Sequence, residues 1–227
     1  MRKILFAILL LAFGIGVFGQ KSKPMNLTTF DSMEAHLGYS VGINWMSYTL
    51  VPNNGMDLSI KQYPGININL VTNIRLAQYL DLRILPGIQF GQRDLFIKDN
   101  NTSEEWDAQI ESVYIDFPIL LKYSSQRVNN YAPYLIAGIN PRFDLTGGEI
   151  EDWRSAQRLV KVFDFFPEIG VGIDFYLANV KMATELKFSI GLRNTFFPPP
   201  PEADYELYGR AIDQMLSRMV IFAIHIG

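Results

Sequence analysis

Hydrophobic and polar residues alternate along much of this chain with a period of two. From Met33 to Trp45 every odd position is apolar or aromatic, and every even position is polar or small. An amphipathic helix would instead repeat its apolar positions every three or four residues. The alternation therefore predicts one long β-strand that has an apolar face and a polar face.

The same alternation returns in seven further segments of the chain. These are residues 66–76, 80–91, 112–123, 134–144, 163–175, 180–193 and 220–227. Most of the eight segments are longer than a typical strand of a soluble protein, which has about five or six residues. They match the roughly nine to eleven residues that a tilted strand needs to cross a bilayer. An even number of such strands is typical of a bacterial outer-membrane barrel.

The connections between the predicted strands alternate between short and long. The short ones lie around residues 77–79, 124–130 and 178–179, and the long ones cover roughly residues 46–62, 92–109, 146–161 and 194–215. Outer-membrane barrels have tight turns at the periplasmic end and longer loops at the outer end. We therefore expect both chain termini on the periplasmic side. A soluble two-sheet sandwich does not require this asymmetry.

Aromatic residues gather near the predicted strand ends. Near the long connections lie Trp45, Tyr48, Tyr63, Phe96, Phe143, Phe163, Phe196 and Phe197, and near the short turns lie Tyr79, Tyr123, Tyr131 and Tyr176. Two aromatic belts are what the two interfaces of a membrane favour. The sequence thus predicts an all-β protein, an eight-stranded antiparallel transmembrane outer-membrane β-barrel, in preference to a soluble all-β domain.

The N-terminus predicts export. Arg2 and Lys3 precede an apolar stretch over residues 4–17, and Val17 and Gly19 occupy the −3 and −1 positions of a cleavage site before Gln20. This is the pattern of a secretory signal peptide. We expect a signal peptide at 1–19, an N-terminal periplasmic segment at 20–32 and the barrel at 33–227. The chain has no cysteine, which excludes a lipoprotein anchor, disulfides and Cys-ligated metal sites.

Charge adds a prediction about the inside of the barrel. Apolar residues make up 48% of the chain, and the alternation turns them toward lipid, so the polar faces line the lumen. The predicted inward basic residues are Arg75, Arg83, Lys122, Arg142, Lys181, Lys187 and Arg193, and the acidic ones are Glu34, Asp81, Asp116, Asp144, Asp164, Glu168, Asp174 and Glu185. Near-equal numbers of the two signs favour mutual pairing, because a buried charge is tolerated only when it is paired. An eight-stranded barrel is just wide enough for side chains to fill it. The alternative is a selective pore lined by these charges.

Other classes of function find little support in the sequence. Without the signal peptide the chain has 18 basic and 23 acidic residues, a formal charge of −5, which argues against nucleic acid as a partner. His36 and His225 are predicted to face inward on the first and last strands, which are neighbours in a closed barrel, but no third metal ligand has a distinctive spacing. No Ser/His/acid arrangement indicates a nucleophile either. We therefore predict no catalytic, cofactor-binding or metal-binding residue, no cofactor and no enzyme activity.

Several strand segments resemble a known family. The stretch from Tyr79 to Arg93, the segments at 116–123 and 134–140, and the opening strand ending Val41-Gly42-Ile43-Asn44 resemble the PorT (SprT) family of Bacteroidetes outer-membrane β-barrels. So do residues 91–94 and 192–198 beside the long connections. The resemblance covers essentially the whole chain after the signal peptide. It implies a non-enzymatic component of the type IX secretion system, required for protein export across the outer membrane and for gliding motility. The alternative is a small outer-membrane pore or a structural or adhesion β-barrel. Its expected partners are outer-membrane lipid and other secretion components, and the resemblance carries over no catalytic residue.

Overall fold

The computed structural model describes residues 24–53, 55–100, 105–146, 160–196 and 211–227, so the predicted signal peptide lies outside the described residues. The ordered elements are η2 (Thr28–Ser32), β1 (Ala35–Pro52), β2 (Met56–Gln62), β3 (Pro64–Ala77), β4 (Leu80–Ile84), β5 (Gly87–Asp99), β6 (Glu105–Asp116), β7 (Ile119–Ser124), β8 (Tyr131–Asp144), β9 (Phe163–Tyr176), β10 (Lys181–Ile190) and β11 (Ile212–Ile226). No helix in this part of the chain is long and apolar enough to span a bilayer.

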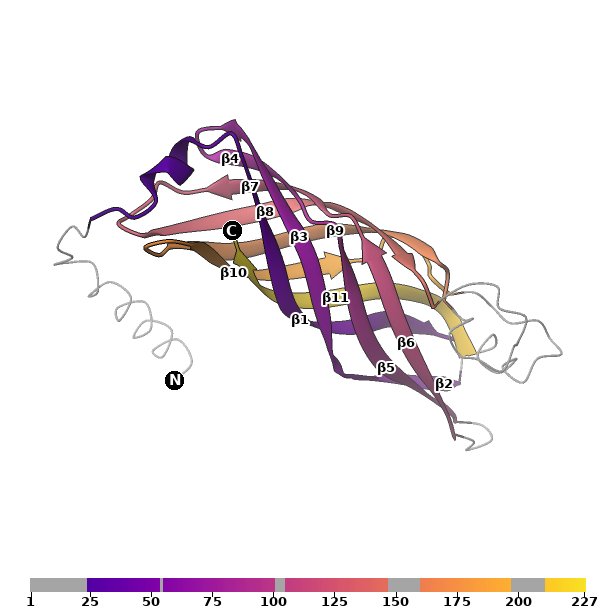
Figure 1. Cartoon of the computed structure of the whole chain (residues 1–227). Coiled ribbons are helices and arrows are strands. Elements are labelled where there is room, and N and C mark those ends of the chain that lie inside the picture. The colour runs from indigo at the N-terminus through magenta and orange to yellow at the C-terminus, as the bar shows by residue number, and fades with distance from the viewer. Residues whose placement is uncertain (1–23, 54, 101–104, 147–159, 197–210) are drawn as a thin grey trace, which may run out of the picture.

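The strands form one closed antiparallel barrel (Figure 1). Strand β2 runs on into β3, β4 into β5, and β6 into β7, so the eleven segments make eight walls, as the alternation predicts. The first and last strands close the ring, with Tyr39 of β1 opposite Ile226 of β11. Closure leaves every strand in the membrane with two neighbours, which lipid requires because it offers no hydrogen bonds to a free sheet edge.

Proline divides two of the predicted strands without changing their faces. The wall 80–99 is interrupted at Pro86, and the neighbouring wall 105–124, which pairs with it, is interrupted at Pro118. Proline has no backbone N–H to donate to the sheet. The pairing keeps the same register on both sides of the interruption, from Leu80 opposite Tyr123 to Lys98 opposite Glu105.

The outward and inward faces follow the predicted alternation within a central band of the barrel. On β3, for example, Ile66, Ile68 and Leu70 are more than half exposed, whereas the residues between them are buried. The outer face of this band is therefore continuous apolar surface suited to acyl chains. Most of the predicted belt aromatics face outward, but Tyr48, Phe196 and Tyr176 are buried, so their assignment to the belts was wrong.

Beyond this band, at the end of the long connections, the two faces exchange polarity. On β5 the outward residues change from Ile88 and Phe90 to Asp94 and Lys98, while Leu95 turns inward. Strand β6 does the same, because Glu105, Asp107, Gln109 and Glu111 face outward there. Water-facing and lipid-facing sheets need opposite patterns, so the exchange marks where the barrel leaves the membrane.

The strands thus continue well past the membrane. The predicted connections over 46–62 and 92–109 were too long, because they consist mainly of β1, β2, β5 and β6. We call residues 46–52, 56–62, 92–99, 105–112 and 212–218 the extension. Its inward side chains form an apolar core together with three residues beside it, Val160, Phe196 and Ala211. The core residues of the extension itself are Tyr48, Leu95, Ile97, Ala108, Ile110, Ile212 and Met215. This core, which resembles the core of a small soluble domain, closes the lumen at the long-connection end.

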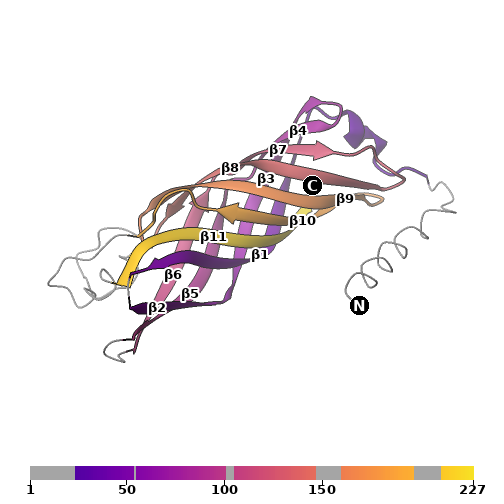
Figure 2. The ribbon, with the colours of Figure 1, turned by 180° about the vertical axis from the view of Figure 1, so that it is seen from behind.

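Tight turns stand at the opposite end, which we call the short-turn end (Figure 2). They join β3 to β4, β7 to β8 and β9 to β10. The C-terminal residue Gly227 lies here, paired through its backbone with Lys181. Residues 24–32, including η2, also lie at this end; we call them the cap segment.

Candidate functional site: the lumen and its mouth

Three buried ion pairs lie in the lumen within the membrane band. Each joins a cation of one wall to a carboxylate of another at 2.6 Å between nitrogen and oxygen: Arg83 to Glu185, Lys122 to Asp174, and Arg142 to Glu168. All six side chains are at most 2% exposed. The mutual pairing expected from the sequence is therefore confirmed for these residues.

Further cations extend the pairs into networks. Lys187 lies 3.1 Å from the second oxygen of Glu168, so this carboxylate serves Arg142 and Lys187 together. Asp174 likewise accepts from Lys122 and from Lys181, the latter at 3.0 Å. Sharing satisfies several lone pairs of each carboxylate, which is the condition under which a buried ion pair is tolerated.

Part of the lumen lining in the membrane band is uncharged. Strands β1, β3 and β5 contribute buried hydroxyl and amide side chains there: Ser40, Asn44, Asn67, Asn69, Asn73 and Gln89. These side chains bond to the charged ones where Asn73 accepts a hydrogen bond from Arg83 at 2.7 Å and Gln89 donates to Asp116 at 2.6 Å. Side chains thus fill the space that a pore would need.

Glycines on the inward face allow the walls to approach. A Cβ on Gly172 would overlap the ring of Tyr134, and a Cβ on Gly170 would lie 2.9 Å from Cγ of Lys187. Glycine at these two positions thus leaves room for the Tyr134 ring and the Lys187 side chain.

Three carboxylates and one cation depart from the expected pairing. Asp164 accepts from the backbone N–H groups of Phe165 and Arg193. Asp116 accepts from the amides of Gln89 and Asn140 rather than from a cation, and Asp144 accepts from the Ser112 hydroxyl at 2.9 Å. Arg93, which the sequence placed in a connection, is 1% exposed and donates to the hydroxyls of Tyr48, Ser112 and Tyr114. Its burial could have been anticipated only by extending the alternation of β5 beyond the membrane.

Glu34 and Arg193 are exposed, so their predicted inward placement was wrong. Both lie next to a strand end, where the alternation no longer constrains them. Arg75 and Asp81 do face one another, at 3.9 Å, but at the short-turn rim of the lumen rather than inside it.

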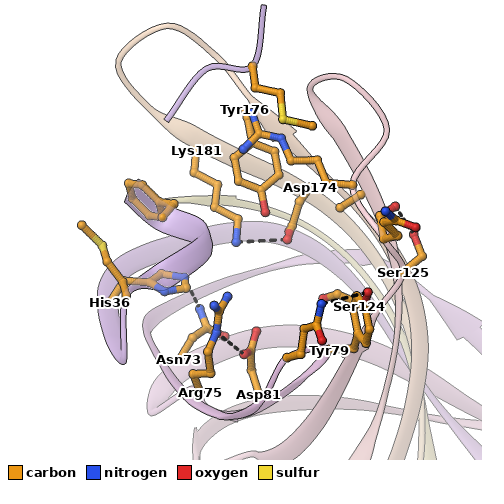
Figure 3. A pocket seen from close by; sticks show the side chains of 17 residues that line it. His36, Asn73, Arg75, Tyr79, Asp81, Ser124, Ser125, Asp174, Tyr176 and Lys181 are labelled. Carbon is orange, nitrogen blue, oxygen red and sulfur yellow. Dashed lines mark hydrogen bonds and ion pairs between the residues drawn. The ribbon is translucent and has the colours of Figure 1, made fainter. Parts of the chain in front are cut away.

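The short-turn mouth contains a pocket of about 270 Å³ (Figure 3). Its floor and walls come from seven strands and from the turns after β3 and β7. They include His36, Asn73, Arg75, Tyr79, Asp81, Ser124, Ser125, Asp174, Tyr176 and Lys181. Met25, Phe30 and Met33 line it from the N-terminal side. The apolar core of the extension closes one end of the lumen, and this pocket is what the other end presents to solution.

The cap segment is fastened to the rim by specific hydrogen bonds. Asn26 accepts from the Arg127 guanidinium through its carbonyl and donates from its side chain to the Tyr176 carbonyl at 3.1 Å. The Asn130 amide joins it from both sides, accepting from the Asn26 backbone N–H at 2.9 Å and donating to the Pro24 carbonyl at 3.2 Å. Residues 24–32 of the predicted N-terminal periplasmic segment are therefore part of the mouth itself.

The hydrogen bonds on the pocket floor determine which atoms face the cavity. The carbonyl oxygen of Asn73 accepts from Arg83, so its amide nitrogen is the group that donates to Nε2 of His36, at 2.9 Å. An imidazole that accepts at Nε2 carries its proton on Nδ1. His36, which lines the pocket, therefore carries an N–H donor at Nδ1.

His36 and His225 line one small cavity of about 20 Å³ between β1 and β11, so their predicted proximity is confirmed. That volume suits a single water molecule. Within the described ranges no group of three or more His, Cys, Asp or Glu side chains is arranged to hold a metal ion.

A closed antiparallel barrel with an apolar outer band and a charged interior defines an outer-membrane β-barrel protein. The sequence profile of the outer membrane protein beta-barrel domain family matches residues 18–196. The chain belongs to this family, and its location is the outer membrane. No curated protein is significantly similar to it in sequence.

Similar solved structures are also outer-membrane proteins. OprG from Pseudomonas aeruginosa is 12% identical, with a TM-score of 0.43 over 85% of this chain and 91% of OprG. Neisserial surface protein A is 8% identical, with a TM-score of 0.43 over 86% of this chain and 99% of that protein. AlkL, solved in DMPC bilayers, is 13% identical, with a TM-score of 0.37 over 92% of each chain.

Proposed function

We propose that this barrel is a non-enzymatic component of the type IX protein secretion system and acts through contacts at its two ends. The observation that carries the proposal is the filled lumen, in which ion pairs, amides and the apolar core of the extension occupy the path that a solute would take. A barrel of this kind is a rigid support for its ends. The resemblance of residues 79–93 and 116–123 to PorT supports the choice of secretion system and a Bacteroidetes source.

In this proposal the short-turn end faces the periplasm and the extension faces the cell exterior. Short turns inside and long connections outside are the usual arrangement of such barrels. Both the cap segment and Gly227 then lie in the periplasm.

Deletion of the gene tests the secretion role. We expect the deletion strain to lose export of type IX substrates and gliding, and a plasmid copy to restore both. Normal export in the deletion strain would refute the proposal.

The second candidate is a small pore, favoured by the charged inner wall. It predicts single-channel conductance in planar bilayers, whereas a filled lumen predicts none. Wild-type protein is the sample, and the matched comparison is Arg142→Ala, which removes a buried lumen side chain that reaches from β8 to Met219 of β11.

A further inference from the structure

The pocket at the short-turn mouth carries more hydrogen-bond donors than its own acceptors use. Lys181 has three N–H groups, and the described contacts assign one of them, to Asp174 at 3.0 Å. Its ammonium otherwise lies over the rings of Tyr176 and Phe30, at 5.2 and 6.0 Å from their centroids. His36 adds the Nδ1–H group fixed by Asn73, and no acceptor contacts it in the part of the chain that the structure describes.

The charge of the pocket has the sign that these donors favour. Its lining contains three cations, Arg75, Arg127 and Lys181, and two carboxylates, Asp81 and Asp174. Asp174 is already shared by Lys122 and Lys181. The formal charge of the lining residues is therefore +1 with neutral His36, which is the sign that favours a negatively charged acceptor group.

The volume of the pocket restricts the ligand that carries this group to a short segment. A volume of about 270 Å³ holds a few residues of an extended peptide, and not a folded domain. Met25 and Met33, which are half exposed at the rim, and the ring of Phe30 supply apolar contact for the atoms next to the anionic group.

We infer that this pocket binds the carboxylate of a short peptide segment, with Lys181 and His36 as the donors that receive it (Figure 3). The carboxylate is either a C-terminus or an Asp or Glu side chain. That the segment belongs to a periplasmic partner rests on the proposed function, whereas the binding itself does not.

Calorimetric titration of the full-length mature barrel in detergent micelles tests this inference with three probes. N-acetyl-alanyl-alanine carries a terminal carboxylate, N-acetyl-aspartate amide carries a side-chain carboxylate, and N-acetyl-alanyl-alanine amide carries none. We expect at least one carboxylate probe to bind and the neutral amide to bind at least tenfold more weakly. The relative affinities of the first two identify the source of the carboxylate.

A variant provides the second arm. Lys181→Gln removes a donor while Asp174 keeps Lys122 as its partner, so the network below the pocket stays charge-balanced. We expect about tenfold weaker binding of the carboxylate probe, the usual effect of one charged hydrogen bond. The matched control is Lys61→Gln on the exposed outer face of β2, which should bind as wild type does.

Each remaining outcome overturns the inference. These are no binding of either carboxylate probe at millimolar concentration, equal binding of the neutral amide, sodium acetate binding as tightly as the peptides, or unchanged affinity in Lys181→Gln. The comparison of probes uses wild-type protein, so it decides the question even if that variant does not fold. A negative result here together with lost export in the deletion strain would reject the pocket and leave the secretion role standing.

Discussion

Glu168 holds two buried cations at once, and its removal should therefore destabilise the barrel more than removal of either cation. In Glu168→Leu, Arg142 loses its ion-pair partner and Lys187 keeps only Glu185 at 3.9 Å. Breaking a buried pair in this way costs about 3–5 kcal/mol of unfolding free energy. Arg142→Met should cost less, because Glu168 retains Lys187 at 3.1 Å. The triple variant Glu168→Leu, Arg142→Met, Lys187→Met removes all three charges of this cluster together and should recover most of the loss.

Urea titration in lipid vesicles, with the heat-dependent gel shift of folded barrels as a second readout, measures these differences. The matched control is Glu105→Gln, because Glu105 also lies 2.6 Å from its cation, Lys98, but both side chains are more than half exposed. The hydrogen bond and charge of Lys98 lower the pKa of Glu105, yet water screens this pair, so we expect no measurable change in stability. Two results would refute the inference that Arg142 and Lys187 share Glu168: equal unfolding free energies of Glu168→Leu and Arg142→Met, or a triple variant less stable than Glu168→Leu.

Three further predictions concern the walls, the membrane position and conduction. Gly172→Ala should lower the unfolding free energy by about 1–3 kcal/mol, because the new methyl overlaps the Tyr134 ring; an unchanged urea midpoint would contradict this. In single-tryptophan variants, brominated lipid should quench the fluorescence of Trp45, which faces the bilayer, but not that of Trp106, which packs against the extension core. Equal quenching of both would show that the membrane boundary assigned here is wrong. Wild-type protein should show no stepwise conductance in planar bilayers, and reproducible steps would favour the pore.

The sequence determined which residues of the membrane band face lipid. A β-strand turns successive side chains to opposite faces, so once the segments around Ile68, Val171 and Phe222 are recognised as strands, their outward orientation follows. The same reasoning identified most of the lumen charges. It required no knowledge of which strand lies beside which.

Two features lay beyond the alternation because it is a local signal. A period of two predicts a strand but does not show whether its outer side meets lipid or water. The inward packing of Leu95 and Ile97 was therefore not predicted. A shift of one residue near Tyr63 also separates β2 from β3: Gln62 pairs with Arg93, but Ile66 pairs with Phe90. As a result Ile60 packs inward and Ile66 faces lipid, although both occupy even positions.

Only closure of the barrel decided the pairing inside it. Arg83 and Glu185 are 102 residues apart in the chain, and nothing local to either selects the other. The mouth pocket has the same origin, since His36, Asp174 and Lys181 meet there because β1, β9 and β10 end at one rim. The sequence by itself thus determined the strands, the faces and the supply of charge, since these depend on backbone periodicity. The tertiary structure alone determined which charges meet and which are left to face a ligand, because that depends on which walls the closed ring places opposite one another.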